Sequence, residues 1–391
     1  MKSALTVFLK EVRENLRDKR TVFSALIYGP LIGPVMFVVL MNTVISNEMS
    51  KAEGPLKVPV IGAEYAPNLI DALKQQGLVP QPPIADPDKA VRDRDTDVVL
   101  RIPADYAKAW TRGEPAQVEV IYDASQMGSG TPTNRLEGML KRYSSQQGAL
   151  RLLARGLSPG VAAPVVVSER DQSTPQSRAG RILSFLPYFF VIAIYIGGMY
   201  LAIDLTAGER ERQSLEPLFA NPVARWRILL GKLGAISAFS LASLVLTVIA
   251  FVIAGGFLPT AKLGMSFDLG ASFVADAILL ELPLIAVFAV LETLVAAFAK
   301  SYREAQTYLG FLMIVPIIPS ALMAVLPVKA AHWMYAVPLL GQQLGISDLL
   351  GGKPVSGSDL GLALVCGFAA AAVLGVITVW VYRSERLAIS A

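Results

Sequence analysis

The hydrophobic positions of this chain gather in long runs rather than in short alternating patterns. A helix needs about 20 apolar residues to cross the roughly 30 Å hydrocarbon core of a bilayer, because each residue adds about 1.5 Å. Six runs approach or exceed that length, so the pattern predicts an α-helical polytopic membrane protein with six transmembrane helices. The expected spans are residues 22–46, 182–206, 233–257, 272–299, 309–326 and 360–382.

A charged segment before the first span has apolar residues at helical spacing. Such spacing places them on one face, while basic residues cover the rest of the surface. We therefore expect residues 1–21 to form an amphipathic helix that lies in the membrane interface. A secretory signal is disfavoured, because the apolar run that follows is too long and no small-x-small cleavage site follows it. The apolar positions are Leu5, Phe8, Leu9, Val12 and Leu16.

Residues 47–180 differ in kind from the rest of the chain. They hold 16 Lys and Arg and 16 Asp and Glu, with no run long enough to span a membrane. Strand-like and helical pieces alternate, which predicts a mixed α/β domain large enough for its own core. Its balanced charge argues against a nucleic-acid partner. Strands are expected at residues 57–61, 97–102, 117–122 and 164–168, and helices at residues 68–76, 104–111 and 134–155.

The composition supports an integral membrane protein and excludes several chemistries. Hydrophobic residues make up 53% of the 391 residues and charged residues 17%, with a net charge of +4. The single cysteine, Cys366, cannot form a disulfide framework, and one histidine, His332, cannot supply a Cys/His metal cluster. The sequence lacks a G-x-x-x-x-G-K-[ST] loop, so any ATP that drives this protein binds to another chain. We expect no catalytic residue, metal or cofactor on this chain.

The basic residues predict how the chain crosses the membrane. Fifteen Lys and Arg lie in the stretches expected on one side, and three lie in the two short loops expected on the other. The side richer in Lys and Arg is cytoplasmic, whereas a long domain such as residues 47–180 is translocated regardless of charge. We therefore predict that both termini are cytoplasmic and that residues 47–180 are extracytoplasmic. The membrane domain, residues 181–391, would hold the five later spans.

The turn between the second and third spans, residues 207–232, is unusually polar. With Asp204 it carries nine charged side chains between two apolar runs. Pro217 and Pro222 interrupt any continuous helix. We expect the second helix to extend to about residue 216 and the chain to return to the membrane from Arg225. Two interpretations are open: a connecting loop that carries topology charges, or a surface that contacts a soluble partner.

The order of residues in this turn resembles a known signature. The run from Gly208 to Lys232, GERERQSLEPLFANPVARWRILLGK, is similar to the pattern E-x-E-x-G-T-L-E-x-L-L-x-x-P-V-x-R-x-x-x-L-L-G-K of ABC type-2 export permeases. Gln213 and Ser214 stand where that family usually has Gly-Thr. Two further segments, KEVRENLRDKRT at residues 10–21 and REAQ at residues 303–306, resemble the sodium-efflux (NatB-like) branch of the family.

The resemblance implies a type V ABC exporter-like fold with an outer domain between the first two of six spans. It implies a permease subunit of an ATP-driven exporter, with sodium efflux across the bacterial cytoplasmic (inner) membrane as its function. The partners implied are a dimer of ABC ATPase subunits, which binds ATP and Mg, and a second permease copy or homologue. The residues implied in ATPase coupling are Glu209, Glu211, Leu215, Glu216, Leu218, Phe219, Pro222, Arg225, Arg303 and Glu304.

Other functions remain open at this stage. Relatives export drugs, lipids or peptides, so only the resemblance to the sodium-efflux branch indicates sodium as the substrate. A mechanotransmission permease, which transmits force to its outer domain, is the main alternative of another kind. Such permeases usually have four spans, and the hydropathy pattern here weighs against them. An intramembrane enzyme is disfavoured, because the spans contain no paired catalytic motif.

Two carboxylates in the fourth apolar run are expected to face the same way. Glu281 and Glu292 are eleven residues apart, about three helical turns. A carboxylate inside a membrane usually faces the bundle interior, a water-filled cavity or a partner. One hypothesis is that the pair lines an ion or proton path, since oxygen ligands suit a hard cation or a proton. The other is that both hold helices together through hydrogen bonds, with Asp276 and Asp204 at the interfaces.

Overall fold

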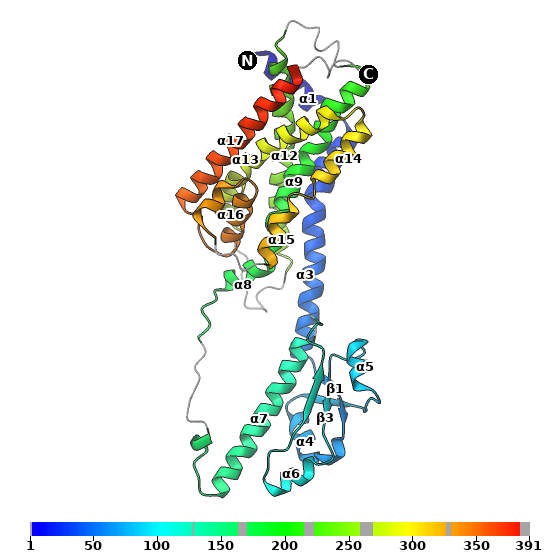
Figure 1. Ribbon diagram of the computed structural model, residues 1–391, viewed down its shortest axis with the longest axis vertical. Helices are drawn as coiled ribbons and strands as arrows, with labels where there is room; N and C mark the ends of the chain where they lie inside the picture. The colour runs from blue at the N-terminus through cyan, green and yellow to red at the C-terminus, as the bar shows by residue number, and fades with distance from the viewer. Residues whose placement is uncertain are drawn as a thin grey trace. The chain divides into compact units, whose positions relative to one another are not determined.

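The computed structural model divides the chain into a helical unit and a mixed α/β unit (Figure 1). The helical unit comprises Met1–Leu40 and Gln172–Ala391, and the α/β unit comprises Met41–Asp171. The structure describes residues 2–126, 129–162, 170–214, 223–258, 269–325 and 330–383.

Six helical segments are long and apolar enough to cross a membrane, which confirms the number of spans predicted from hydropathy. The fifth span begins at Tyr302, seven residues before its predicted start. Ser301 explains the difference, because its hydroxyl accepts a hydrogen bond from Glu304 N at 3.2 Å and starts the helix there. The segments are Lys19–Glu53, Leu183–Glu211, Arg225–Gly255, Ala271–Phe298, Tyr302–Met323 and Gly357–Arg383.

The N-terminal segment is two helices rather than the single helix expected over residues 1–21. Helix α1 ends at Asn15, and α2 begins at Lys19. Asp18 separates them, because its carboxylate accepts hydrogen bonds from Arg20 N at 3.0 Å and from the Thr21 hydroxyl at 2.7 Å. The first span therefore starts at this cap. Its parts are α1 (Lys2–Asn15), α2 (Lys19–Val22), a π-helical turn (Phe23–Tyr28) and α3 (Gly29–Glu53).

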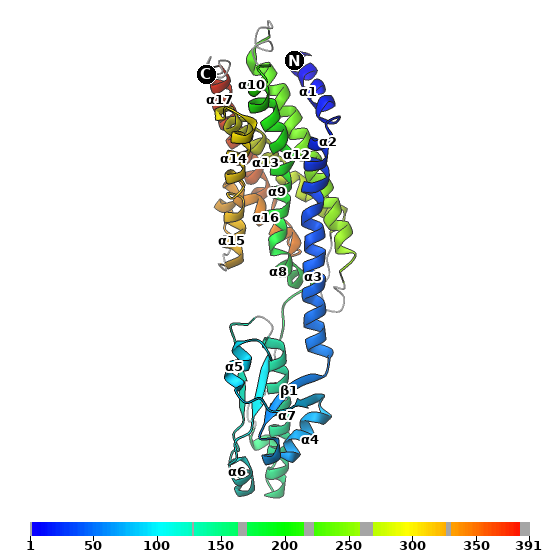
Figure 2. The ribbon, with the colours of Figure 1, turned by 90° about the vertical axis from the view of Figure 1, so that its right-hand side faces the viewer.

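Three long helices form the centre of the helical unit: α9 (Leu186–Ile203), α12 (Arg225–Gly255) and α13 (Ala271–Phe298) (Figure 2). Helices α9 and α12 approach closely at small residues. A Cβ added to Gly197 would lie 2.6 Å from Ser243 Cβ, and the Ser243 hydroxyl donates to the Ala193 carbonyl at 2.8 Å. Small residues and short interhelical hydrogen bonds are typical of helix pairs in membranes.

Shorter helices pack around these three. They are α8 (Pro175–Ile182), α14 (Tyr302–Leu312), α15 (Ile317–Val325) and α16 (Leu340–Leu350), and the long helix α17 (Gly357–Arg383) completes the unit. Helix α16 lies between the fifth and sixth predicted spans, and its Gly345 packs against Leu280 of α13. The buried Gln343 side chain accepts from the Ser320 hydroxyl at 2.8 Å and donates to the Pro316 carbonyl at 3.0 Å. Gln343 therefore satisfies a carbonyl at the break between α14 and α15.

The α/β unit contains a four-stranded sheet with the order β2-β1-β3-β4. The central strand β1 is parallel to β2 and β3, whereas β4 is antiparallel to β3. Apolar side chains of β1 and β3 form its core with α4 and α7. The elements are β1 (Leu56–Ile61), α4 (Pro67–Gln75), β2 (Leu78–Gln81), α5 (Pro87–Arg92), β3 (Val98–Arg101), α6 (Tyr106–Arg112), β4 (Glu119–Tyr122) and α7 (Gly130–Ala154).

Most elements of this unit match the sequence pattern. Three of the predicted strands are β1, β3 and β4, and the predicted helices are α4, α6 and α7. The pattern missed β2, a four-residue strand, because Pro80 lies inside it and a proline argues against a strand. The strand predicted over residues 164–168 lies outside the described residues.

Candidate coupling surface and buried carboxylates

The second span ends in a tight turn at Gln213. A π-helical turn (Asp204–Gly208) leads into α10 (Glu209–Glu211). The turn then closes with hydrogen bonds from Ser214 N to the Glu209 carbonyl at 2.9 Å and from Gln213 N to the Arg210 carbonyl at 3.0 Å. This is a Schellman motif, and it ends the helix five residues before the expected position near residue 216. Gln213 occupies the position that favours glycine, with φ of 56°.

A buried ion pair joins this turn to the third span. Lys232 of α12 is 1% exposed, and its ammonium group binds the Glu209 carboxylate. The same ammonium donates to the Leu205 carbonyl at 2.7 Å. Removing one partner of a buried pair leaves an uncompensated charge, which costs far more than an exposed pair is worth. The pair therefore fixes the turn to α12.

Helix α1 packs against α12 beside this ion pair (Figure 2). A Cβ on Gly231 would lie 2.7 Å from both the Ala4 carbonyl oxygen and Val7 Cβ, so the two helices touch through backbone there. Glu11 of α1 is 2% exposed, and burial raises the pKa of its carboxyl although Lys10 bonds it at 3.1 Å. The apolar stripe of α1 is only partly covered: Phe8 and Val12 pack against the helical unit, whereas Leu5 stays 57% exposed.

The segment that contains Arg303 and Glu304, also implied in ATPase coupling, contacts the turn at the end of the second span. The Glu211 carboxylate accepts a hydrogen bond from Tyr302 N at 2.7 Å, at the N-terminus of α14. The Arg210 guanidinium donates to the Ala299 carbonyl at 3.3 Å. Glu304 accepts from Lys300 N at 2.7 Å and so holds the turn that precedes the helix. Carboxylates are favourable at a helix N-terminus, where backbone N–H groups lack partners.

A cleft of about 300 Å³ opens between α2, the end of α9 and the start of α14. Arg20 and Tyr302 line it together with Asp204 and Arg212, which form an ion pair at 2.9 Å. The bond to Asp204 raises the pKa of Arg212. The cleft therefore has charged walls on the surface formed by the two turns, which we call the coupling surface (residues 204–214 and 299–304).

The structure places five of the ten residues implied in ATPase coupling. Glu209 is buried, whereas Glu211 and Glu304 cap α14. Arg303 is exposed, and Arg225 begins α12 and donates to the Arg383 carbonyl at 3.2 Å. The other five, Leu215, Glu216, Leu218, Phe219 and Pro222, lie outside the described residues.

Sequence reasoning missed Lys232 and Glu11 as members of this site. Lys232 ends the polar turn and enters a long apolar helix, so a charge at that point needs a partner. Glu11 lies between Phe8 and Val12, at the edge of the apolar stripe of α1. An acidic residue at such an edge is a weak signal of a protein contact. Helical spacing would have been enough to place Glu11 there.

Glu281 and Glu292 of α13 lie in the interior of the helical unit. Each is 0% exposed, and none of their carboxylate oxygens has a hydrogen-bond partner among the residues that the structure describes. Asp276 of the same helix is exposed, and Asp204 is at the coupling surface. A buried carboxylate without a partner is stable only when a proton or a cation neutralises it.

Glu292 lies at the close crossing of α9 and α12. A Cβ added to Gly198 would be 2.7 Å from a Glu292 oxygen and 2.6 Å from the Ser240 hydroxyl. The Ser240 hydroxyl is itself buried without a partner in the described chain. The two groups thus present unbonded oxygens to the same glycine. Hydroxyl and carboxylate oxygens suit a proton or a hard monovalent cation. No group of three His, Cys, Asp or Glu side chains that could hold a metal ion occurs among the described residues.

Comparison with known proteins identifies the class. Residues 26–380 match the family model described as ABC-2 family transporter protein, so the chain belongs to the ABC-2 transporter family. In this family the ATPase is a separate subunit, and the chain is the permease component. It is similar to the ABC transporter permease protein NatB of Bacillus subtilis (strain 168), with 26% identity over 318 residues that cover 80% of each chain. These matches confirm the resemblance drawn from the polar turn.

Proposed function

We propose that this permease exports sodium ions across the bacterial cytoplasmic membrane, driven by a dimer of ATPase subunits that bind ATP and Mg. A second permease copy or homologue would complete the pathway. Both termini and the coupling surface would face the cytoplasm, and residues 47–180 would be extracytoplasmic. The charge asymmetry between the loops supports this orientation.

The contacts of the coupling surface support a route for mechanical work. Glu209 connects the first turn to α12 through Lys232, and Glu211 connects the same turn to α14 through Tyr302 N. A partner that displaces this turn therefore moves two membrane helices together. Helix α1 would move together with α12, because the two helices pack closely at Gly231. In the proposed cycle, ATP closes the ATPase dimer and the helices rock to open the pathway outward.

The buried Glu292 carboxylate is the observation that carries the ion-path proposal. It has no hydrogen-bond partner in the described residues, and it shares the α9–α12 crossing with the unbonded Ser240 hydroxyl. The alternative, that Glu281 and Glu292 hold helices together, requires interhelical hydrogen bonds, and the described residues supply none to either carboxylate. The sodium-efflux resemblance in residues 10–21 and 303–306 favours sodium over a larger substrate.

Reconstitution with the cognate ATPase in liposomes tests the proposal. ATP-driven ²²Na⁺ transport should occur with the wild-type permease and should fall at least tenfold in Glu292→Gln and Glu281→Gln. The matched control is Asp276→Asn, which changes an exposed carboxylate of the same helix and should leave transport unchanged. Normal transport per folded molecule in Glu281→Gln, Glu281→Ala and Glu292→Gln would refute the ion path.

A further inference from the structure

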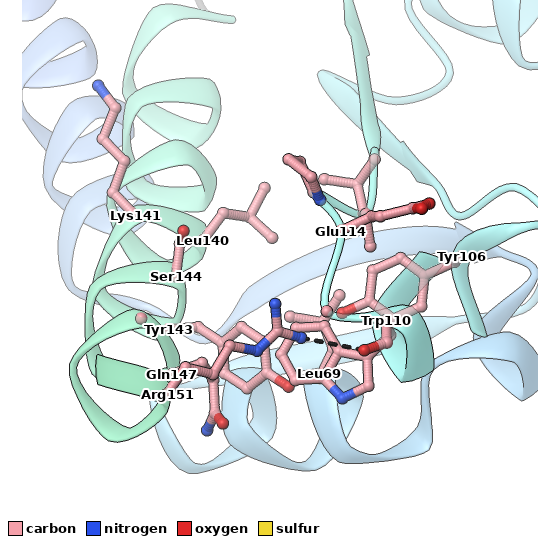
Figure 3. A pocket seen from close by; sticks show the side chains of 15 residues that line it. Leu69, Tyr106, Trp110, Glu114, Leu140, Lys141, Tyr143, Ser144, Gln147 and Arg151 are labelled. Atoms are coloured by element: carbon pink, nitrogen blue, oxygen red, sulfur yellow. Dashed lines mark hydrogen bonds between the residues drawn. The ribbon is translucent and has the colours of Figure 1, made fainter. Parts of the chain in front are cut away.

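The α/β unit contains a cavity that the transport mechanism does not use (Figure 3). Its volume is about 490 Å³, and its walls come from α4, α6, α7 and the turn at residues 113–118. All of these elements belong to the α/β unit. Sites for small molecules typically have about 300–1,000 Å³, a mainly apolar lining and a few polar groups. This cavity fits that description.

Three stacked aromatic rings form one wall of the cavity. Trp110 is the central ring, with its centroid 5.8 Å from those of Tyr106 and Tyr143 and interplanar angles of 13° and 22°. The two tyrosines are buried, whereas Trp110 is half-buried. Burial raises the pKa of Tyr106 to about 12, so its hydroxyl stays neutral at physiological pH. The rings therefore form a rigid wall beside the cavity, with Trp110 as its most exposed member.

The polar groups around the aromatic wall are mainly basic. The Arg151 guanidinium lies 4.3 Å from the Trp110 ring centroid and donates to the Trp110 carbonyl at 3.2 Å, which holds it at the wall (Figure 3). Lys141 also lines the cavity, with its ammonium group pointing away from Arg151 and the rings (Figure 3), and Arg155 approaches Gly113. No ion pair between described residues involves any of the three. Glu114 is the acidic side chain of the lining, so positive charge predominates.

Open space adjoins α7 at a glycine. Gly148 lines the cavity, and a Cβ added there would meet no atom within 4 Å. Its φ is not positive, so the backbone does not require glycine. A helix interior normally favours alanine over glycine. Any larger residue in place of Gly148 would extend its side chain into the cavity.

We propose that this cavity binds a small organic anion with an aromatic body. The flat body would lie against this wall, over the Arg151 guanidinium that covers the Trp110 ring. A carboxylate or similar group would bind the remaining N–H donors of Arg151. Gly148 leaves the space that the body needs. This inference is independent of the sodium proposal, because it rests on the α/β unit alone.

Binding of 2-naphthoate to the intact permease in detergent tests the proposal by titration calorimetry. The wild-type protein should bind saturably, and Gly148→Leu should abolish binding because the new side chain fills the cavity. The matched control is Gly138→Leu on the same helix, where the nearest neighbour of an added Cβ is the end of the Arg142 side chain at 3.9 Å. This control should bind as the wild type does. Arg151→Gln should weaken binding at least tenfold.

Three results would overturn the inference. The first is no saturable binding of 2-naphthoate to the wild-type protein. The second is equal binding to Gly148→Leu and the wild type, which would show partition into detergent. The third is equal affinity for the uncharged 2-naphthamide, which would refute the role of the basic groups. Circular dichroism and melting curves of each variant establish that a loss of binding is not a loss of folding.

Discussion

Two buried carboxylates in the helical unit have opposite surroundings. Glu209 pairs with Lys232, which also bonds the Leu205 carbonyl, so its charge is compensated by the protein. Glu292 is more deeply buried than Glu209, yet its oxygens have no partner in the described residues. A compensated charge fixes two elements together, whereas an uncompensated one requires a proton or cation from outside. Under the proposed function, this difference suits Glu209 to force transmission and Glu292 to ion handling.

The largest expected effect comes from breaking the compensated pair. Lys232→Met leaves the Glu209 charge buried without a partner, which should lower the free energy of unfolding by about 3–5 kcal/mol. Chemical denaturation in mild detergent measures the change. Adding Glu209→Gln to the same protein should restore most of the loss, because the stranded charge is removed. A loss that persists in the double variant would show that the pairing is not the cause.

The second-largest loss of stability should come from a substitution at the contact between α1 and α12. Gly231→Ala places a methyl group 2.7 Å from backbone and from Val7, so it should cost about 1–3 kcal/mol and lower the melting temperature. Gly234→Ala is the matched control, because its Cβ would lie 3.2 Å from the Phe8 ring, which can move. Equal effects in both variants would contradict a close backbone approach at Gly231.

The sequence predicts the architecture of this site better than its contacts. Hydropathy gives six spans, and helical spacing places Glu281 and Glu292 on one buried face. The pairing of Glu209 with Lys232 joins two helices, and periodicity along one helix carries no information about the other. The break at Asp18 is likewise decided by a side-chain cap rather than by hydropathy. The sequence did not predict the Schellman motif at the end of the second span, because Gln213 stands at the position where such a motif usually has glycine.

That glutamine supplies a smaller prediction. Gln213 has a left-handed backbone, which costs a residue with a side chain about 1 kcal/mol, so Gln213→Gly should stabilise the permease by that amount. Thermal unfolding under matched detergent conditions measures the gain. Gln213→Ala is the control, since alanine keeps the strain. If both variants behave alike, the turn does not hold the conformation described.

The smallest expected effect concerns Glu11 and pH. Burial raises the pKa of this carboxyl, so above the ordinary value of 4.5 the folded protein retains a proton that the unfolded chain has lost. Rising pH therefore lowers stability through this group. Glu11→Gln should melt at a higher temperature than the wild type at neutral pH, and the difference should vanish as the pH falls below 4.5. A pH-independent difference for Glu11→Gln would contradict this assignment.

The contrast between the two carboxylates is tested most directly by measuring sodium transport and ATP hydrolysis together in one reconstituted complex. The account predicts that Glu292→Gln abolishes ²²Na⁺ transport while the permease still stimulates its ATPase. It predicts that Lys232→Met with Glu209→Gln, although folded, loses that stimulation. Transport by Glu292→Gln at the wild-type ratio of sodium to ATP would contradict the account.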